Sequence, residues 1–181
     1  RASDAFGSLA RLVILASAQL LSPRYKLSRP APATPAEATA GPAKIRAWDE
    51  YWLKPKSPLF RIYGWIAALY RKYLIKRNLD RLLTDHFPAK SRLLHAGCGS
   101  GQVDTEVTEA HSVIALDLSA PALKVYQQIH DDSHDLVRGT IFSLPIKDAT
   151  IDGIYHLGVM EHFDEREIQQ ILAEFHRILK P

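Results

Sequence analysis

The stretch LLHAGCGSGQ, residues 93–102, decides how this chain is interpreted. An apolar run precedes three glycines at alternate positions, and a second apolar run over residues 113–116 ends in Asp117, sixteen residues after Gly101. This order predicts a strand, a glycine-rich turn, a helix and a second strand with a carboxylate at its end. Glycine permits close backbone approach and positive φ, and a carboxylate about twenty residues on can accept hydrogen bonds from ribose hydroxyls. The pattern therefore indicates a site for an adenosine-containing cofactor.

The glycine spacing differs from that of dinucleotide sites. Those sites carry G-x-G-x-x-G or G-x-G-x-x-A, and the third small residue packs the helix on the strand beside a pyrophosphate. Gln102 and Asp104 occupy that third position in the two frames of this sequence, and a carboxylate near a helix N-terminus repels a phosphate. The pattern present is G-x-G-x-G, formed by Gly97, Gly99 and Gly101. An oxidoreductase with a nicotinamide cofactor is therefore kept only as an alternative, which NADH titration would test.

The chain resembles the class I S-adenosylmethionine-dependent methyltransferases, and within them the methyltransferase type 11 group. The resemblance covers residues 91–181 well and residues 45–90 loosely, and rests on the glycine motif with Asp117, Leu144-Pro145, Asp148, Asp152 and Glu161-His162. It implies an enzyme that moves the methyl group of S-adenosylmethionine to a small-molecule or lipid-like acceptor by in-line displacement. A non-catalytic relative that binds the cofactor, or serves as a partner subunit, is the alternative. The acceptor itself cannot be read from the sequence.

The resemblance also implies which residues bind the cofactor: His95, Gly97, Cys98, Gly99, Gly101, Asp117, Leu118, Thr140, Ile141, Phe142 and Leu157. Two of them depart from the family's pattern. Thr140 stands where an aspartate usually contacts the adenine amine, so adenine recognition is expected to rest more on Ile141 and Phe142. His95 stands where Asp or Glu helps to bind the amino group or orders the loop. A neutral histidine can accept one hydrogen bond there but brings no negative charge.

Methyl transfer needs little covalent chemistry from the protein, because the sulfonium already activates the methyl carbon. The protein aligns nucleophile and methyl, and removes a proton when the acceptor is a hydroxyl. His162 is the candidate base, followed by His156 and Glu161; alternatively, Glu161 and His162 cap the next helix or fix the loop. Some quinone-pathway relatives bind a divalent metal through a further glutamate three residues before the Glu-His pair. Gly158 holds that position here, so we expect no metal site.

Apolar periodicity predicts an α/β fold. We expect strands over 92–96, 112–117, 135–141 and 151–157, and helices over 101–110, from Ser119 to about Ile129, and after Asp164, where Glu167 completes a capping pattern. Repeated β-α units imply a Rossmann-like, doubly wound, mostly parallel sheet in three αβα layers, with additional N-terminal helices. Because the family's sheet has seven strands, we expect an incomplete sheet whose fourth strand is a bare edge, in a fragment or a truncated gene product.

The N-terminal part divides into three segments by composition. Residues 1–21 are apolar and suit the end of a signal or anchor, an interfacial helix or a docking helix. Residues 22–43 are rich in Pro and Ala and form a linker, and residues 44–181 form the methyltransferase domain. Its first helices include one from about 59 to 83. The resemblance implies that Trp48, Tyr51 and Trp52 lie beside the cofactor's amino-acid end.

The amino-acid composition of the chain limits the cellular compartment and the kinds of partner that we expect. With 181 residues and 46% hydrophobic content the chain suits one globular domain, and its single cysteine, Cys98, fits a reducing, cytoplasmic compartment and serves as a small side chain. Residues 1–100 carry 17 Lys and Arg against 6 Asp and Glu, whereas residues 101–181 carry 6 against 14. The basic half is either a solvated helical face or a membrane-surface contact. Nucleic acid is not the expected partner, and the oligomeric state is left open.

Overall fold

A computed structural model describes residues 12–15, 42–53, 73, 75–130 and 135–181 of the chain. The elements are, in chain order, β1 (Leu12–Leu15), α2 (Pro42–Leu53), α4 (Lys76–His86), β2 (Arg92–Ala96), α5 (Thr105–Ala110), β3 (Ser112–Asp117), α6 (Ala120–Ile129), β4 (Asp135–Arg138), β5 (Gly153–Leu157), the 3-10 turn η2 (Met160–His162) and α7 (Glu165–Ile178).

The strands form one parallel sheet in the order β1-β5-β2-β3-β4. At its centre, Leu94 of β2 lies between Ile114 of β3 and Ile154 of β5. The predicted bare edge at the fourth strand is wrong, because Leu12–Leu15 pairs along β5 and satisfies its outer backbone groups. The apolar N-terminal segment therefore contributes a strand that sequence periodicity did not reveal.

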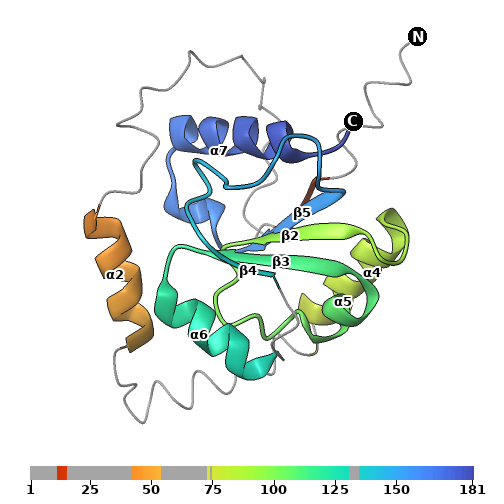
Figure 1. Ribbon diagram of the computed structural model, residues 1–181, viewed down its shortest axis with the longest axis horizontal. Coiled ribbons are helices and arrows are strands. Elements are labelled where there is room, and N and C mark those ends of the chain that lie inside the picture. Colours follow the sequence, from red (N-terminus) through yellow and green to blue (C-terminus); the bar gives the residue numbers. More distant parts are fainter. Residues whose placement is uncertain (1–11, 16–41, 54–72, 74, 131–134) are drawn as a thin grey trace.

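Helices cover both faces of the sheet, as Figure 1 shows. α7 lies on one face and α4, α5 and α6 lie on the other, while α2 stands beside one end of the strands. Successive strand residues point to opposite faces, so β2 sends Leu94 into the core beneath Ile171 and Phe175 of α7, and Leu93 into the core beneath Leu79 of α4. The predicted Rossmann-like, three-layer α/β architecture is confirmed.

The polar residues predicted to cap two helices do mark where those helices begin. Asp164 accepts a hydrogen bond from the N–H of Glu167, whose side chain accepts one from the N–H of Asp164, and this capping box begins α7. Ser119 caps α6 by a single bond, since its hydroxyl accepts from the N–H of Ala122. α5 begins at Thr105, later than predicted, because Gly101 has a left-handed φ of +62° that no right-handed helix contains.

Other boundaries moved by a few residues. β4 ends at Arg138, three residues before the predicted end, because the chain turns at Thr140, which bridges to Ser143. α2 begins at Pro42, at the end of the predicted linker. Residues 16–41 and 54–72 lie outside the described residues, so most of the linker and the first part of the helix predicted from about 59 to 83 are not tested. The choice between a solvated face and a membrane contact for the basic stretch is not tested either.

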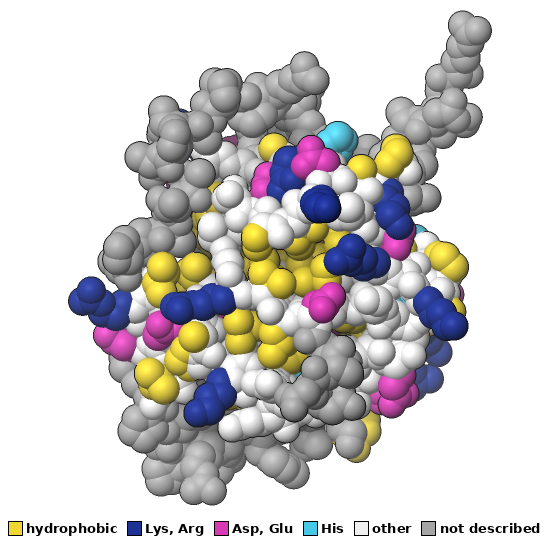
Figure 2. Space-filling view, viewed as in Figure 1, with side chains coloured by type: hydrophobic (Ala, Val, Ile, Leu, Met, Phe, Trp, Pro, Cys, Tyr) yellow, Lys and Arg dark blue, Asp and Glu magenta, His cyan; other side chains and the backbone are white. Residues whose placement is uncertain are grey.

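The described surface mixes charges of both signs. On the face in Figure 2, Lys and Arg side chains alternate with Asp and Glu side chains around a middle region of hydrophobic side chains. Within the described part of the chain, no helix has the length and apolarity required to cross a bilayer.

Candidate active site

A cavity of about 460 Å³ opens at the carboxyl ends of the strands, the edge where open parallel sheets bind ligands. Its floor is the glycine-rich turn after β2, its sides are the segments that follow β3, β4 and β5, and α2 lies across it with Trp48, Tyr51 and Trp52. In Figure 1, α2 stands at this end of the sheet. The size is within the range of small-molecule and cofactor sites.

Every residue that the sequence analysis predicted for cofactor binding lines this one cavity: His95, Gly97, Cys98, Gly99, Gly101, Asp117, Leu118, Thr140, Ile141, Phe142 and Leu157. They come from four separate segments of the chain. The fold therefore assembles them at one place.

The glycine-rich turn requires its glycines. Gly97, Gly99 and Gly101 have φ values of +74°, +53° and +62°, in the left-handed region that side chains disfavour. The N–H groups of Gly97 and Cys98 both donate to the carbonyl of Leu116, at 2.8 and 2.9 Å, and this fastens the turn to β3. A Cβ on Gly99 would lie 3.1 Å from Trp52, so the lack of a side chain brings the backbone against the cavity.

Asp117 is held by two backbone donors. Its Oδ2 accepts from the N–H of Gly99 and its Oδ1 accepts from the N–H of Ser119, each at 2.9 Å. Burial raises the pKa of this carboxyl, and the two backbone hydrogen bonds oppose that rise. Each carboxylate oxygen has a second lone pair. A residue in this arrangement can accept hydrogen bonds from two neighbouring hydroxyls of a ligand.

A buried polar network lies behind the turn. The Nδ1 atom of His95 lies 2.7 Å from Oδ2 of Asp104, and the hydroxyls of Tyr126 and Tyr155 donate to the same carboxylate at 3.0 and 3.1 Å. From the sequence, Asp104 was noted only because its charge would repel a phosphate, and its contact with His95 was missed. Its position just after the glycine turn, where the chain returns to the end of β2, could have indicated this contact.

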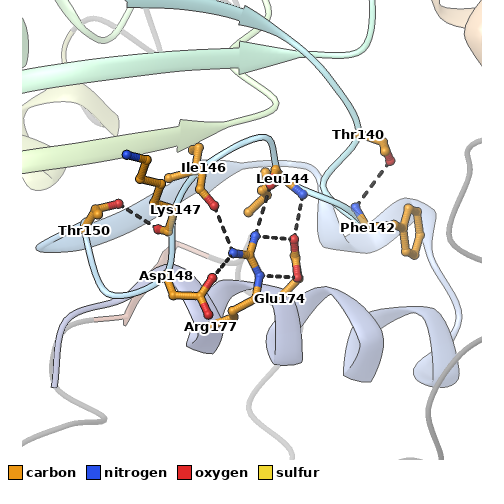
Figure 3. A network of polar contacts seen from close by, with 9 residues as sticks. All are labelled: Thr140, Phe142, Leu144, Ile146, Lys147, Asp148, Thr150, Glu174 and Arg177. Atoms are coloured by element: carbon orange, nitrogen blue, oxygen red, sulfur yellow. Dashed lines mark hydrogen bonds and ion pairs between the residues drawn. The ribbon is translucent and has the colours of Figure 1, made fainter.

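The segment over residues 140–142 forms a further wall, and Figure 3 shows how it is fixed. The N–H of Phe142 donates to the hydroxyl of Thr140 at 3.3 Å. Further on, the guanidinium of Arg177 donates to the carbonyls of Leu144 and Ile146 at 3.0 and 2.9 Å, and Glu174 accepts from the N–H of Leu144 at 2.7 Å. α7 thus holds the loop that follows the cavity wall.

The three candidate bases occupy different environments. His162 lines the cavity, has a side chain that is 45% exposed, and packs edge-on against Trp48 with ring centroids 5.1 Å apart. The Oε1 atom of Glu161 lies 3.9 Å from Nε2 of His162, but Glu161 itself is exposed and does not line the cavity. Neither residue caps α7, whose cap is Asp164.

His156 is buried, with 2% of its surface exposed, and does not line the cavity. Neither of its ring nitrogens has a hydrogen-bond partner in the described part of the chain. Burial, and to a smaller extent the nearby His95, lowers the pKa of its imidazole to about 4. His156 is therefore buried away from the cavity, whereas His162 lines it.

Cys98, the single cysteine of the chain, is buried in the glycine-rich turn. Burial, followed by the nearby Asp117 and Asp104, raises the pKa of the Cys98 thiol, so this side chain is not a nucleophile at neutral pH. Among the described residues, no group of three His, Cys, Asp or Glu side chains is arranged to hold a metal ion.

The chain is similar in sequence to known methyltransferases. Residues 94–181 match a family described as a methyltransferase domain. The tRNA 5-carboxymethoxyuridine methyltransferase of Escherichia coli is 42% identical over 60 residues, which cover 33% of this chain and 23% of that protein. The demethylmenaquinone methyltransferase of Lactiplantibacillus plantarum is 33% identical over 105 residues, which cover 53% of this chain and 44% of that protein. The chain spans less than half the length of these relatives.

The fold has counterparts among solved structures. One is the TehB-like SAM-dependent methyltransferase of Corynebacterium glutamicum, with a TM-score of 0.52 and 24% sequence identity, covering 76% of this chain and 68% of that one.

Proposed function

Residues 94–181 belong to the methyltransferase domain family, and from this premise we propose that the chain binds S-adenosylmethionine in its cavity and transfers the methyl group to a small-molecule or lipid-like acceptor. The observation that carries the proposal is the position of Asp117. Its carboxylate is fixed by the N–H of Gly99, inside the glycine-rich turn, and stands at the end of the strand next to that turn. A ribose bound to Asp117 would therefore lie beside the glycine-rich turn.

The rest of the cofactor follows from the order of the strands. The adenine is placed beside Ile141 and Phe142, which line the cavity after β4. The methionine part extends the other way, toward the ends of β2 and β5, where Leu157 and His162 lie. The reactive methyl group is thereby directed at the segment that carries the candidate base.

The nature of the cavity favours an acceptor without negative charge. Its described lining includes no Lys or Arg, whereas sites for polyanions rely on such side chains. Aromatic rings instead surround the side toward α2, among them Trp48, Tyr51 and Phe163. These rings support our proposal of an apolar or aromatic small molecule as the acceptor.

His162 is the group to accept a proton from a hydroxyl acceptor. It lines the cavity, is open to solvent for release of that proton, and is oriented by the edge-on contact with Trp48. In-line positioning supplies the remainder of the rate enhancement.

Calorimetric titration of the chain with S-adenosylmethionine, and separately with NADH, tests the proposal. We expect S-adenosylmethionine to bind and Asp117→Asn to weaken its binding at least about tenfold, since hydrogen bonds to a charged group are lost. Asp135→Asn makes the same chemical change on an exposed residue at the far end of β4 and is the control. Binding of NADH alone would instead support an oxidoreductase.

Transfer is then measured with S-adenosylmethionine labelled on its methyl group, against a panel of hydroxylated aromatic compounds, long-chain lipids and bulk tRNA. Label in the aromatic or lipid fraction that is lost in His162→Gln supports the proposal. Label in the tRNA fraction would overturn the acceptor class. Cofactor binding with no transfer across the panel would favour the non-catalytic alternative.

A further inference from the structure

The side chain of His130 forms a hydrogen bond with the glycine-rich turn. His130 is the C-cap of α6 and is 5% exposed, and its Nε2 atom lies 2.8 Å from the carbonyl oxygen of Gly101, 29 residues earlier in the chain. A carbonyl oxygen can only accept a hydrogen bond, so Nε2 carries the hydrogen and donates, whether the ring is neutral or protonated. His130 does not line the cavity, whereas Gly101 does. Any effect of His130 on a ligand therefore passes through the backbone of Gly101.

The carbonyl of Gly101 lies where the turn ends. It also accepts from the N–H of Asp104 at 2.9 Å, while the N–H of Gly101 donates to the carbonyl of Cys98 at 3.0 Å. The carbonyl oxygen has two lone pairs, and each of them has a donor in this arrangement. Because the peptide unit is planar, the direction of this carbonyl also fixes the direction of the N–H of Gln102, a residue that lines the cavity. The two bonds thus define the orientation of one whole peptide unit beside the cavity.

A glycine at this position makes that orientation easy to lose. Gly101 has no Cβ and a φ of +62°, so its backbone is less restricted by steric contacts than that of other residue types. Rotation of the peptide unit between Gly101 and Gln102 would turn the carbonyl oxygen away from His130 and reverse the peptide dipole beside the cavity. The bond from His130 opposes this rotation, because the rotation would leave a buried donor without its acceptor.

The ring of His130 is itself held in place. It packs against the ring of Tyr126, with centroids 4.3 Å apart and an interplanar angle of 31°. Tyr126 is 0% exposed, and its hydroxyl donates to Asp104 at 3.0 Å. Both rings face Gly101, since a Cβ there would lie 2.9 Å from Nε2 of His130 and would overlap Tyr126. The donor is therefore in position before any ligand binds.

α6 contacts the proposed cofactor site at both of its ends. Ser119, its N-cap, donates from its N–H to Oδ1 of Asp117, and His130, its C-cap, donates to the carbonyl of Gly101. Asp117 and the glycine-rich turn are the two parts of the site on which the proposed function depends. A helix of ten residues joins the two contacts, so it holds both parts in a fixed relation.

We propose that His130 is a positioning residue for the binding of S-adenosylmethionine. The hydrogen on its Nε2 atom holds the carbonyl of Gly101 and thereby keeps the glycine-rich turn in the form that binds the cofactor. His130 itself touches no part of the ligand, and its role belongs to the donor atom and not to the volume of the ring. The inference rests on the proposed function.

Two substitutions separate the hydrogen bond from the packing of the ring. His130→Gln places an amide donor at about the position of Nε2 but removes the ring, whereas His130→Phe keeps a ring against Tyr126 but removes the donor. Dissociation constants for S-adenosylmethionine are measured by calorimetry on both variants and on the unaltered chain. His86→Phe is the matched control, since Nδ1 of His86 lies 2.8 Å from the carbonyl oxygen of Leu82, on a helix that does not line the cavity.

We expect His130→Phe to bind S-adenosylmethionine about tenfold or more weakly, as for the loss of one buried hydrogen bond, and His130→Gln and His86→Phe to bind it within about threefold of the unaltered chain. Thermal unfolding shows whether each variant is folded. Unchanged affinity in a folded His130→Phe, or a loss in His130→Gln as large as that in His130→Phe, would overturn the role of the hydrogen bond while leaving the cofactor site intact. An unaltered chain that does not bind S-adenosylmethionine would overturn the proposed function, and this inference with it.

A second measurement needs no substitution, so it decides the matter where His130→Phe fails to fold. In the ¹⁵N spectrum of the unaltered chain with labelled histidine, we expect a hydrogen on Nε2 of His130 and a coupling across the hydrogen bond to the carbonyl carbon of Gly101. A bond that strengthens ligand binding is itself strengthened by the ligand, so this coupling should increase when S-adenosylmethionine binds. A hydrogen on Nδ1 alone, or a coupling that does not change on binding, would overturn the inference.

Discussion

The hydroxyl of Ser119 donates a hydrogen bond to Oδ1 of Asp49 at 2.7 Å, and this contact joins α2 to the start of α6 across 70 residues of sequence. Asp49 lies one residue after Trp48 and three before Trp52, the side chains with which α2 covers the cavity. Asp49 therefore helps to hold α2 over the cavity, together with the packing of Trp48 against His162.

Asp49→Ala is expected to weaken S-adenosylmethionine binding about three- to tenfold, because α2 loses its polar attachment while the sheet and its cores stay intact. The melting temperature should change by no more than about 3 °C. Calorimetry and thermal unfolding measure the two effects. Glu50→Ala, an exposed neighbour on the same helix, is the control. If Asp49→Ala and Glu50→Ala change the affinity equally, the attachment has no role in binding.

The planar guanidinium group of Arg177 is expected to stabilise the folded chain. It donates to both oxygens of Glu174, at 2.9 and 2.7 Å, and also to Asp148 and two loop carbonyls (Figure 3). Arg177→Met should lower the free energy of unfolding by about 2 kcal/mol, since these acceptors lose a charged donor. Arg177→Lys keeps the charge but not the fork, so it should recover less than half of that loss. Urea unfolding measures both, and full recovery by lysine would show that charge alone suffices.

The sequence predicted the centre of the sheet well and its margins less well. β2 and β3 begin and end where expected, because each is a continuous apolar run between polar or glycine-rich turns. The start of α7 followed from Asp164 and Glu167, whose side chains interact locally. β1 was not predicted, because a four-residue strand, Leu12–Leu15, carries no periodic signal of its own and is defined only by pairing with β5.

The same distinction applies to the site. Glycines and a strand-end carboxylate are local signals, and the structure brings the residues that they indicated together along one cavity. The bond from His95 to Asp104 and the burial of His156 are tertiary contacts, which a single sequence does not encode in its spacing. His156 and His162 are six residues apart and read alike as candidate bases, yet only His162 reaches the cavity.

Gly101 should not tolerate a side chain. Its φ is +62°, and a Cβ at this position would overlap the ring of Tyr126. Gly101→Ala is therefore expected to lower the free energy of unfolding by about 2–4 kcal/mol, from backbone strain and overpacking together. Gly139→Ala is the matched control, since a Cβ there would make ordinary contacts of 3.4 Å or more, and it should change stability by less than about 1 kcal/mol. Urea unfolding distinguishes the two, and equal losses would contradict the left-handed turn.

His156 should make the folded chain sensitive to acid. Its pKa is lowered from 6.5 to about 4 by burial, so between these values the unfolded chain binds a proton that the folded chain does not. Stability is unaffected above pH 6.5 and falls as the pH drops toward 4, by about 3 kcal/mol in total. His156→Leu should remove this component, which urea unfolding from pH 7 to pH 4 measures as a difference from the unaltered chain. His176→Leu, an exposed histidine on α7, is the control; parallel curves for His156→Leu and the unaltered chain would contradict a buried, uncharged imidazole.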